Sequence, residues 1–361
     1  MIIDSHAHIF PWLGGAAGYE SAELHRLYLQ KGMVDHVQPV HRFDSNEIVA
    51  GSGLLWDPDR PGISGYREVM FEVLPYGRFA WTTHGERYYL QYMPPALQAN
   101  EAPAEFLIAL MDHAGVDVAV LQNDHLYGDL NQYFAQAVRT FPERFIGLIQ
   151  VDETIADHEE QVARLHDGTK SGLRGLYYKP AAFFRSDFRE FFDAPRFAGF
   201  WSEVESLKLP TYWDLVPLPR STRADYLDQL TRFASWCERY PEVPCLLVMG
   251  MPTRLFFESG RLEVPPLLVE LARARGVLVE LTLPIAWGRW HEYPFQEIDV
   301  IARTLYDLVG ASSLVWGSDV PNVERYCTYQ QSLNYLSRIC PFLSQADLNA
   351  ILGDNLQPFF S

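Results

Sequence analysis

Short apolar runs alternate with longer amphipathic stretches along most of the chain. The first run is IIDSHAH at the start, and seven more occupy residues 116–122, 144–151, 173–179, 209–214, 243–249, 277–283 and 313–319. Between them lie stretches with helical spacing of apolar residues, such as NQYFAQAVRTF and IDVIARTLYDLV. Several runs are apolar at nearly every position, as expected of strands that are buried on both faces of a parallel sheet. The pattern therefore predicts eight strand–helix units.

Eight such units favour an α/β protein with one domain over residues 1–361, a (β/α)8 barrel of the TIM type. An open, doubly wound sheet is the alternative, but no GxGxxG turn follows the first strand. Residues 40–100 interrupt the alternation with aromatic and β-branched residues and turn residues, which predicts a small β-sheet. Because this insertion follows the first strand, we expect it to cap the catalytic mouth of the barrel.

Composition and charge narrow the class of protein. A chain of 361 residues with 48% hydrophobic content buries a large core, and a formal charge of −17 argues against nucleic-acid binding. No signal peptide or membrane span is evident, and the four cysteines form no CxxC pair. These features predict a soluble cytoplasmic protein that acts on a small molecule, with the choice between monomer and homo-oligomer left open.

The first strand ends in two histidines, His6 and His8. Residues i and i+2 of a strand point to the same side, so the two imidazoles project together. Converging imidazoles form half of a metal site. The alternative is a pair of ordinary histidines near the chain start.

Asp319 follows the last apolar run directly, in the stretch LVWGSDVPN. In a closed barrel the first and eighth strands are neighbours, so Asp319 would meet His6 and His8 at one rim. Two imidazoles and a carboxylate suit Zn²⁺, with Mn²⁺ as the second choice. The alternative for Asp319 is a turn or a helix N-cap.

The stretches DSHAHIF and WGSDVPN resemble the amidohydrolase superfamily. More narrowly, they are similar to the branch that includes aminocarboxymuconate semialdehyde decarboxylase and related hydratases and lactonases, as are MDHAGVDVAVLQ, PERFIGLIQVD, GLRGLYYKP and ILGDN. The resemblance covers most of the chain outside residues 40–100. It implies a metal ion at the C-terminal mouth of the barrel, with His6 and His8 as ligands. It also implies that Asp319 contacts the metal or accepts a proton as the catalytic base.

Two positions depart from the pattern of that branch. Its fifth strand usually ends in a histidine, whereas LPTYWD places Asp214 there; its sixth strand also ends in a histidine, where VPCLLVMGMP has Met249. We expect Asp214 to serve as a substitute metal ligand, and the alternative is an ion pair with an arginine such as Arg220. A thioether neither transfers protons nor binds hard cations strongly, so the usual second acid–base group is absent.

Four residues near the predicted strand ends are candidates for substrate binding. Lys179 ends the fourth strand and would pair with a substrate carboxylate, although an ordinary rim lysine is an equal alternative. Trp213 offers a stacking surface for a flat ligand. Arg289 and His291 follow the seventh strand and would supply an anion contact and a proton donor.

Glu280 lies within the apolar seventh run. Burying an unpaired carboxylate is costly, so we expect Glu280 to face outward or to be paired, with Arg254 or Arg174 as the partner.

Together these features predict a metal-dependent hydrolase for a C–N, ester or lactone bond of a small, carboxylated or cyclic substrate. The ion would polarise the carbonyl and activate water, with Asp319 as base. Non-oxidative decarboxylation of an aromatic or unsaturated acid is the alternative reaction. A ligand-binding barrel with reduced catalysis is a further alternative: two replaced histidines support it, and retention of His6, His8 and Asp319 opposes it.

Overall fold

Eight parallel strands form the centre of the molecule. The computed structural model describes residues 1–361 except 35–37, 51, 61, 216–221 and 361. In the described part, the central strands are β1 (Ile3–Ala7), β7 (Val118–Leu121), β8 (Phe145–Gly147), β9 (Leu176–Tyr178), β10 (Thr211–Trp213), β11 (Cys245–Leu247), β14 (Leu278–Leu281) and β15 (Leu314–Trp316). Each lies within one of the eight apolar runs, so the predicted strand set is confirmed.

The strands pair in two parallel sheets that join at both edges. One sheet has the order β1-β7-β8 and the other the order β15-β14-β11-β10-β9. Isolated parallel bridges link Ala7 to Val320 and Ile149 to Leu176. The eight strands thus close into the predicted barrel, with the first and last strands as neighbours.

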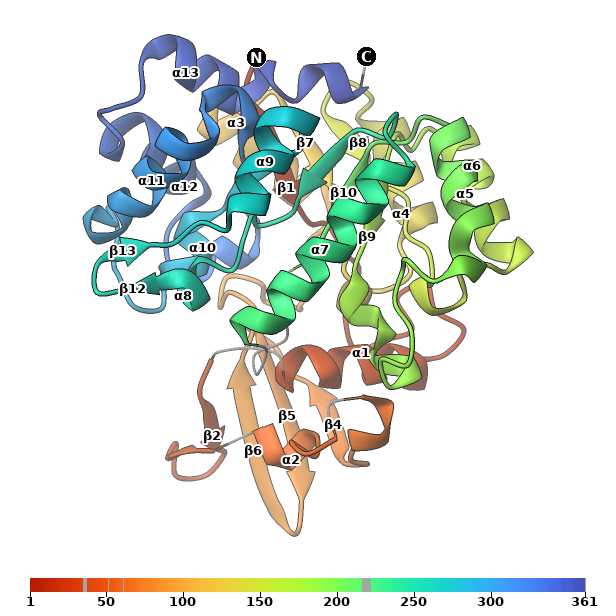
Figure 1. The fold of residues 1–361 in the computed structure, drawn as a ribbon. Helices are drawn as coiled ribbons and strands as arrows, with labels where there is room; N and C mark the ends of the chain where they lie inside the picture. Colours follow the sequence, from red (N-terminus) through yellow and green to blue (C-terminus); the bar gives the residue numbers. More distant parts are fainter. Residues whose placement is uncertain (35–37, 51, 61, 216–221, 361) are drawn as a thin grey trace.

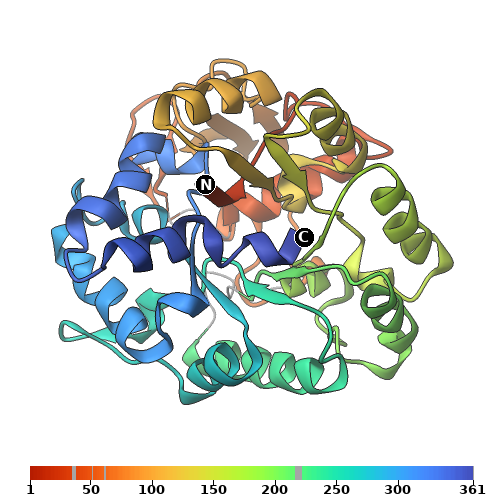
Figure 2. The same ribbon diagram turned by 90° about the horizontal axis from the view of Figure 1, so that it is seen from above.

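Helices surround the barrel (Figure 2). The longer ones are α1 (Ala22–Val34), α3 (Ala104–Ala114), α4 (Asn131–Thr140), α5 (Glu159–Lys170), α6 (Ala198–Ser206), α7 (Arg223–Arg239), α9 (Pro266–Arg275), α11 (Asp299–Val309) and α12 (Tyr329–Ile339). Short elements connect them, namely α2 (Ser52–Leu55), α8 (Thr253–Phe256), α10 (Leu283–Trp287), α13 (Gln345–Asn349) and the hairpin β12 (Phe257–Glu258) and β13 (Arg261–Leu262). No helix of the described residues has the length and apolar character needed to cross a membrane.

Side chains of the strands alternate between the barrel interior and the helix layer. Tyr212 packs in an interior cluster with Ile3 and Leu246, and Phe360 near the C-terminus packs against the same cluster. Its neighbour Trp213 belongs to a different cluster and contacts Trp201 of α6, with ring centroids 5.2 Å apart. The strand period of two therefore sends adjacent residues into different layers.

The insertion after β1 forms a separate antiparallel sheet of order β3-β2-β6-β5-β4. Its strands are β2 (Val40–Arg42), β3 (Ile48–Val49), β4 (Met70–Val73), β5 (Arg78–Thr83) and β6 (Glu86–Gln91). His84 and Gly85 connect β5 to β6 with φ angles of 52° and 78°, as a two-residue turn with positive φ requires. Both chain termini lie at one end of the barrel and this sheet at the other (Figure 1). The β-rich insertion is confirmed, and its role as a cap stays a prediction.

Candidate metal centre and cavity

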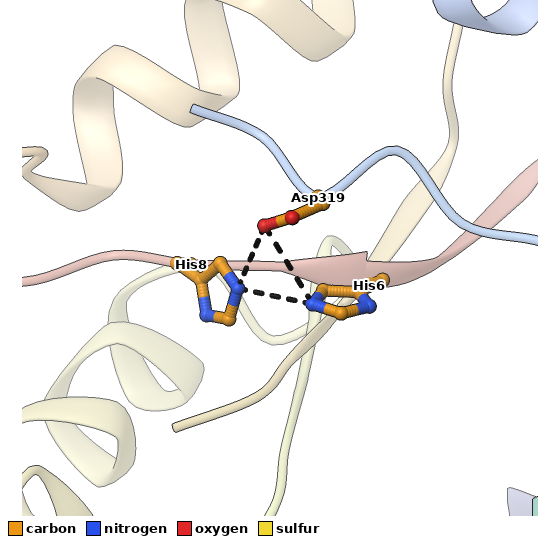
Figure 3. A group of neighbouring side chains, drawn as sticks. All are labelled: His6, His8 and Asp319. Carbon is orange, nitrogen blue, oxygen red and sulfur yellow. Dashed lines mark hydrogen bonds and ion pairs between the residues drawn. The ribbon is translucent and has the colours of Figure 1, made fainter. Parts of the chain in front are cut away.

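Three buried side chains converge where β1 and β15 end (Figure 3). The Nε2 atoms of His6 and His8 lie 3.0 Å apart, and Oδ1 of Asp319 lies 3.1 Å from the His8 Nε2 and 3.7 Å from the His6 Nε2. Among the described residues, these three form the group of histidine, cysteine and acidic side chains whose ligand atoms are close enough for one metal ion. The convergence predicted from the strand pattern is therefore present.

Backbone pairing of the first and last strands creates this convergence. The amide of Asp319 donates to the carbonyl of His6 at 2.9 Å, and the amide of His8 donates to the carbonyl of Val320 at 2.8 Å. Gly317 permits the close approach, because a Cβ there would lie 2.8 Å from both the Glu280 carboxylate and the Cβ of His6.

Hydrogen bonds to the other ring nitrogens orient both imidazoles. His8 Nδ1 lies 2.9 Å from the carbonyl oxygen of Gln122, which only accepts, so Nδ1 of His8 is the donor. His6 Nδ1 donates to Oε2 of Glu280 at 2.8 Å. In the neutral rings, both Nε2 lone pairs then face the Asp319 carboxylate. Such acceptors repel one another unless a proton or cation lies among them, and this donor set fits Zn²⁺ or Mn²⁺.

The protonation states reflect the same crowding of acceptors. Burial disfavours the charged form of His6, but the Glu280 and Asp319 carboxylates outweigh burial and raise the pKa of His6 to about 9. Burial also opposes ionisation of Asp319, yet the two histidines lower the pKa of Asp319 to about 2. Without a metal, the imidazolium of His6 thus supplies the cation that the centre requires.

Glu280 of β14 is buried and paired, but not with an arginine. Its carboxylate accepts hydrogen bonds from His6 Nδ1, from Ser5 Oγ at 2.5 Å and from the amide of Met249 at 2.8 Å. The expectation that Arg254 or Arg174 is its partner is wrong. At the position of the usual sixth-strand histidine, Met249 contributes its backbone amide to this network.

Asp214 lies outside the three-residue metal group. Its Oδ2 accepts from Tyr177 at 2.8 Å and lies 3.1 Å from the ammonium of Lys179, which also bonds to Asp124. Burial disfavours the charge on Lys179, but the two carboxylates outweigh burial and hold the pKa of Lys179 well above its usual value. The structure thus replaces the expected fourth metal ligand with an ion-pair network. Arg220, the arginine considered for Asp214, lies outside the described residues.

A cavity of about 480 Å³ opens over the metal group and the Asp214 network. Its wall includes Asp124, Lys179 and Asp214 on one side. Other polar and aromatic residues in the wall are Tyr92, His125, Tyr127, Tyr177, Arg254, Asn322, Arg325 and Tyr326. The metal group and Lys179 therefore share one space, as a binding site for a small molecule requires.

Three predicted substrate residues lie outside this cavity wall. Trp213 is fully buried beneath the helices, because its neighbour Asp214 takes the inward-facing position of the strand. Arg289 is exposed and stacks on Trp290, with its Cζ 5.6 Å from the ring centroid. His291 lies 3.7 Å from the Glu297 carboxylate. Both residues lie in the loop after α10, outside the cavity wall.

Several cavity residues were not predicted. Asn322 donates to Oδ1 of Asp319 at 2.7 Å and to the hydroxyl of Tyr127 at 2.6 Å, and thereby orients the aspartate. Asp124 lies three positions after the end of β7, in the stretch QNDH, so its place after a barrel strand was a usable signal. Arg325 has no comparable sequence signal, because it ends the helical turn Asn322–Arg325, farther from the end of β15.

Comparisons with known proteins agree with this architecture. A family model described as Amidohydrolase matches residues 3–355. A search of the curated proteins finds no match. The similar solved structures named below are less than 25% identical to this chain, so their likeness concerns the fold alone.

Three of these structures differ in their described activity and in the group that they bind. A probable 2-pyrone-4,6-dicarboxylic acid hydrolase from Acinetobacter baumannii, with citric acid bound, is 18% identical over 72% of this chain and 89% of its own, with a TM-score of 0.56. An amidohydrolase from Burkholderia multivorans with bound zinc is 17% identical over 73% and 89%, with a TM-score of 0.55. A dihydroxybenzoic acid decarboxylase from Polaromonas sp. JS666 with bound manganese is 16% identical over 70% and 84%, with a TM-score of 0.51.

Proposed function

We propose that this chain, which belongs to the amidohydrolase family, is a metal-dependent hydrolase that cleaves a C–N, ester or lactone bond of a small organic substrate. The observation that carries the proposal is the convergence of two oriented imidazoles and a carboxylate at the cavity wall. The bound zinc and manganese of two similar structures also support it.

His6, His8 and Asp319 would hold the ion, with Zn²⁺ as the first choice and Mn²⁺ as the second. Three protein ligands leave coordination positions open, which is the pattern of catalytic rather than structural zinc sites. When bound, the ion would polarise the scissile carbonyl and lower the pKa of water.

The protein's own residues would position the reacting groups. Asn322 holds Asp319 through Oδ1, and the second carboxylate oxygen of Asp319 would accept a proton from the attacking water. Lys179, kept protonated by its two carboxylates, would act as a hydrogen-bond donor to a substrate oxygen. Closure of the cavity by residues 40–100 would exclude water, and Tyr92, directly after β6, already contributes to the cavity wall.

Non-oxidative decarboxylation of an aromatic or unsaturated acid is the second candidate. The tyrosine-rich cavity wall, with Tyr92, Tyr127, Tyr177 and Tyr326, favours a flat aromatic ligand. The similar decarboxylase structure also supports this second candidate. We also propose a cytoplasmic location, which the four buried cysteines, all without disulfides, support.

The first test is metal content and turnover of the purified protein. We expect about one zinc or manganese per chain, and loss of that metal in His6→Ala and His8→Ala variants. His166→Ala is the matched control, because His166 is exposed and does not line the cavity. Acid release from lactones, esters and amides would establish hydrolysis, whereas CO₂ release from aromatic acids would establish the alternative. Wild-type protein that binds neither zinc nor manganese would contradict both candidate reactions.

A further inference from the structure

Asn322 forms a hydrogen-bonded bridge between the metal group and Tyr127. Its Nδ2 lies 2.7 Å from Oδ1 of Asp319 and 2.6 Å from the hydroxyl oxygen of Tyr127. Because an ionised carboxylate only accepts hydrogen bonds, the NH₂ group of Asn322, and not its carbonyl oxygen, must face Asp319. This orientation leaves the carbonyl oxygen of Asn322 buried without a partner, so the demand of the carboxylate outweighs that cost.

The direction of this bridge determines what the hydroxyl of Tyr127 can do. Both N–H bonds of the Asn322 side chain are used, one by Asp319 and the other by Tyr127. The hydroxyl oxygen of Tyr127 is therefore an acceptor, and its own proton is directed elsewhere. Among the residues that the structure describes, none accepts that proton in a hydrogen bond. Tyr127 thus has an unused donor.

The hydroxyl also keeps its proton. Burial and the neighbouring Tyr92 and Asp319 raise the pKa of Tyr127 well above its usual value, and the N–H of Asn322 offsets only part of this effect. A phenol in this state donates a hydrogen bond but does not ionise.

Packing on two sides holds the ring of Tyr127 beside the metal group. Its centroid lies 4.6 Å from that of the His8 ring, and it stacks on Phe10 with centroids 4.8 Å apart. Tyr127 ends the helical turn His125–Tyr127, which begins where the carboxylate of Asp124 accepts from the amide of Leu126. The hydroxyl therefore has a defined position.

That position is on the cavity wall, next to the proposed centre. Tyr127, Asn322 and Asp319 all line the cavity, and one amide nitrogen bonds to the oxygens of the other two. A substrate carbonyl that enters beside the metal group would come close to the Tyr127 hydroxyl. The carbonyl oxygen gains negative charge when water attacks, and a fixed donor stabilises that charge.

We infer that Tyr127 is a catalytic residue that donates a hydrogen bond to the substrate oxygen beside the metal group. Asn322 is the positioning residue that directs this donor. The inference rests on the proposed function, because it requires a substrate bound next to His6, His8 and Asp319. Tyr127 keeps its proton throughout, so no group is transferred to the substrate.

The test measures binding of acetohydroxamate to zinc-loaded protein by calorimetry. This probe binds zinc through charged oxygen, so it places a hydrogen-bond acceptor beside the metal group. Tyr127→Phe removes only the hydroxyl, and we expect it to weaken the probe about tenfold or more, as for a lost hydrogen bond to a charged group. Zinc affinity should not change. Tyr133→Phe on α4, outside the cavity wall, is the matched control and should bind the probe like the wild type.

A double-mutant cycle at saturating zinc tests the role of Asn322. Asn322→Ala removes the N–H that directs the hydroxyl, so Tyr127→Phe should weaken the probe less in that background than in the wild type. Asn322→Leu, of similar size, replaces Asn322→Ala if that variant proves unstable. An undiminished effect of Tyr127→Phe would overturn the positioning role of Asn322.

Two outcomes separate this inference from the proposed function. Zinc-loaded Tyr127→Phe that binds acetohydroxamate like the wild type would overturn the donor role alone. Wild-type protein that binds no zinc or manganese would overturn the proposed function and the donor role together.

Discussion

Glu280 accepts a hydrogen bond from Nδ1 of His6 at 2.8 Å, although the two residues are 274 positions apart. Since this carboxylate occupies Nδ1, the ring presents Nε2 to His8 and Asp319. Carboxylates that bond to metal-ligating histidines fix the ring orientation and increase its basicity. Glu280 is therefore a positioning residue of the proposed metal centre.

We predict that Glu280→Gln weakens zinc binding about 10- to 100-fold, the usual cost of losing such a partner. Zinc affinity would be measured by competition with a chromogenic chelator, and circular dichroism would verify the fold. Glu263→Gln is the control, because Glu263 is exposed. An unchanged zinc affinity in Glu280→Gln would contradict the positioning role.

Asp214→Asn should leave metal content unchanged, because Asp214 lies outside the metal group. The same substitution should lower the free energy of unfolding by about 3 kcal/mol, since it removes one carboxylate from the buried Lys179 network. Urea denaturation and elemental analysis of identically purified proteins would measure the two effects. Loss of metal in this variant would restore Asp214 as a ligand.

Asp152 gives a prediction about pH. Burial raises its pKa, but Arg185 and the hydroxyl of Thr154 outweigh burial and lower the pKa of Asp152 below its usual value. A carboxyl with a lowered folded-state pKa stabilises the protein above its unfolded-state pKa of about 4, and this stability is lost as pH falls through the folded-state value.

Asp152→Asn should therefore be less stable than the wild type at pH 7, and the difference should shrink below about pH 4. Denaturation midpoints across pH 3 to 8 would measure the difference. A gap that is constant over this range would show that the Asp152 charge does not contribute.

Trp213→Ala should destabilise the protein by about 3–5 kcal/mol, as expected when a buried aromatic side chain leaves a cavity. Metal content should not change, because Trp213 packs beneath the helices and lies outside the cavity wall. Trp12→Ala is the control for tryptophan loss, since Trp12 is 53% exposed. Loss of metal in Trp213→Ala, with the fold intact, would place the indole nearer the site than the structure does.

The metal group was predictable because two simple rules determine it. The strand period of two aligns His6 with His8, and closure of the barrel makes Asp319 their neighbour. The same period excludes Trp213 from the cavity once its neighbour Asp214 faces inward. The prediction that Trp213 binds the substrate could therefore have been avoided from the sequence alone.

Other features of the site depend on the course of the chain in three dimensions, which local sequence patterns do not encode. Lys179 pairs with Asp214 across two adjacent strand ends. The sequence alone predicted separate roles for them, Asp214 as a metal ligand and Lys179 as a substrate contact or an ordinary rim lysine. Arg254 and Arg325 reach the cavity from short helical segments whose directions are set by packing. Packing likewise leaves Arg289 and His291 outside the cavity wall.

The bridge between Ala7 and Val320 also has a consequence for biosynthesis. The ribosome makes His6 and His8 before Asp319, which follows more than 300 residues later in the chain. At about 5–20 residues per second, translation separates the two ends of the centre by roughly 15 to 60 seconds. The nascent chain thus contains both imidazoles of the proposed metal centre long before their carboxylate partner exists. Full-affinity metal loading is therefore a late event, completed after the last barrel strand has emerged.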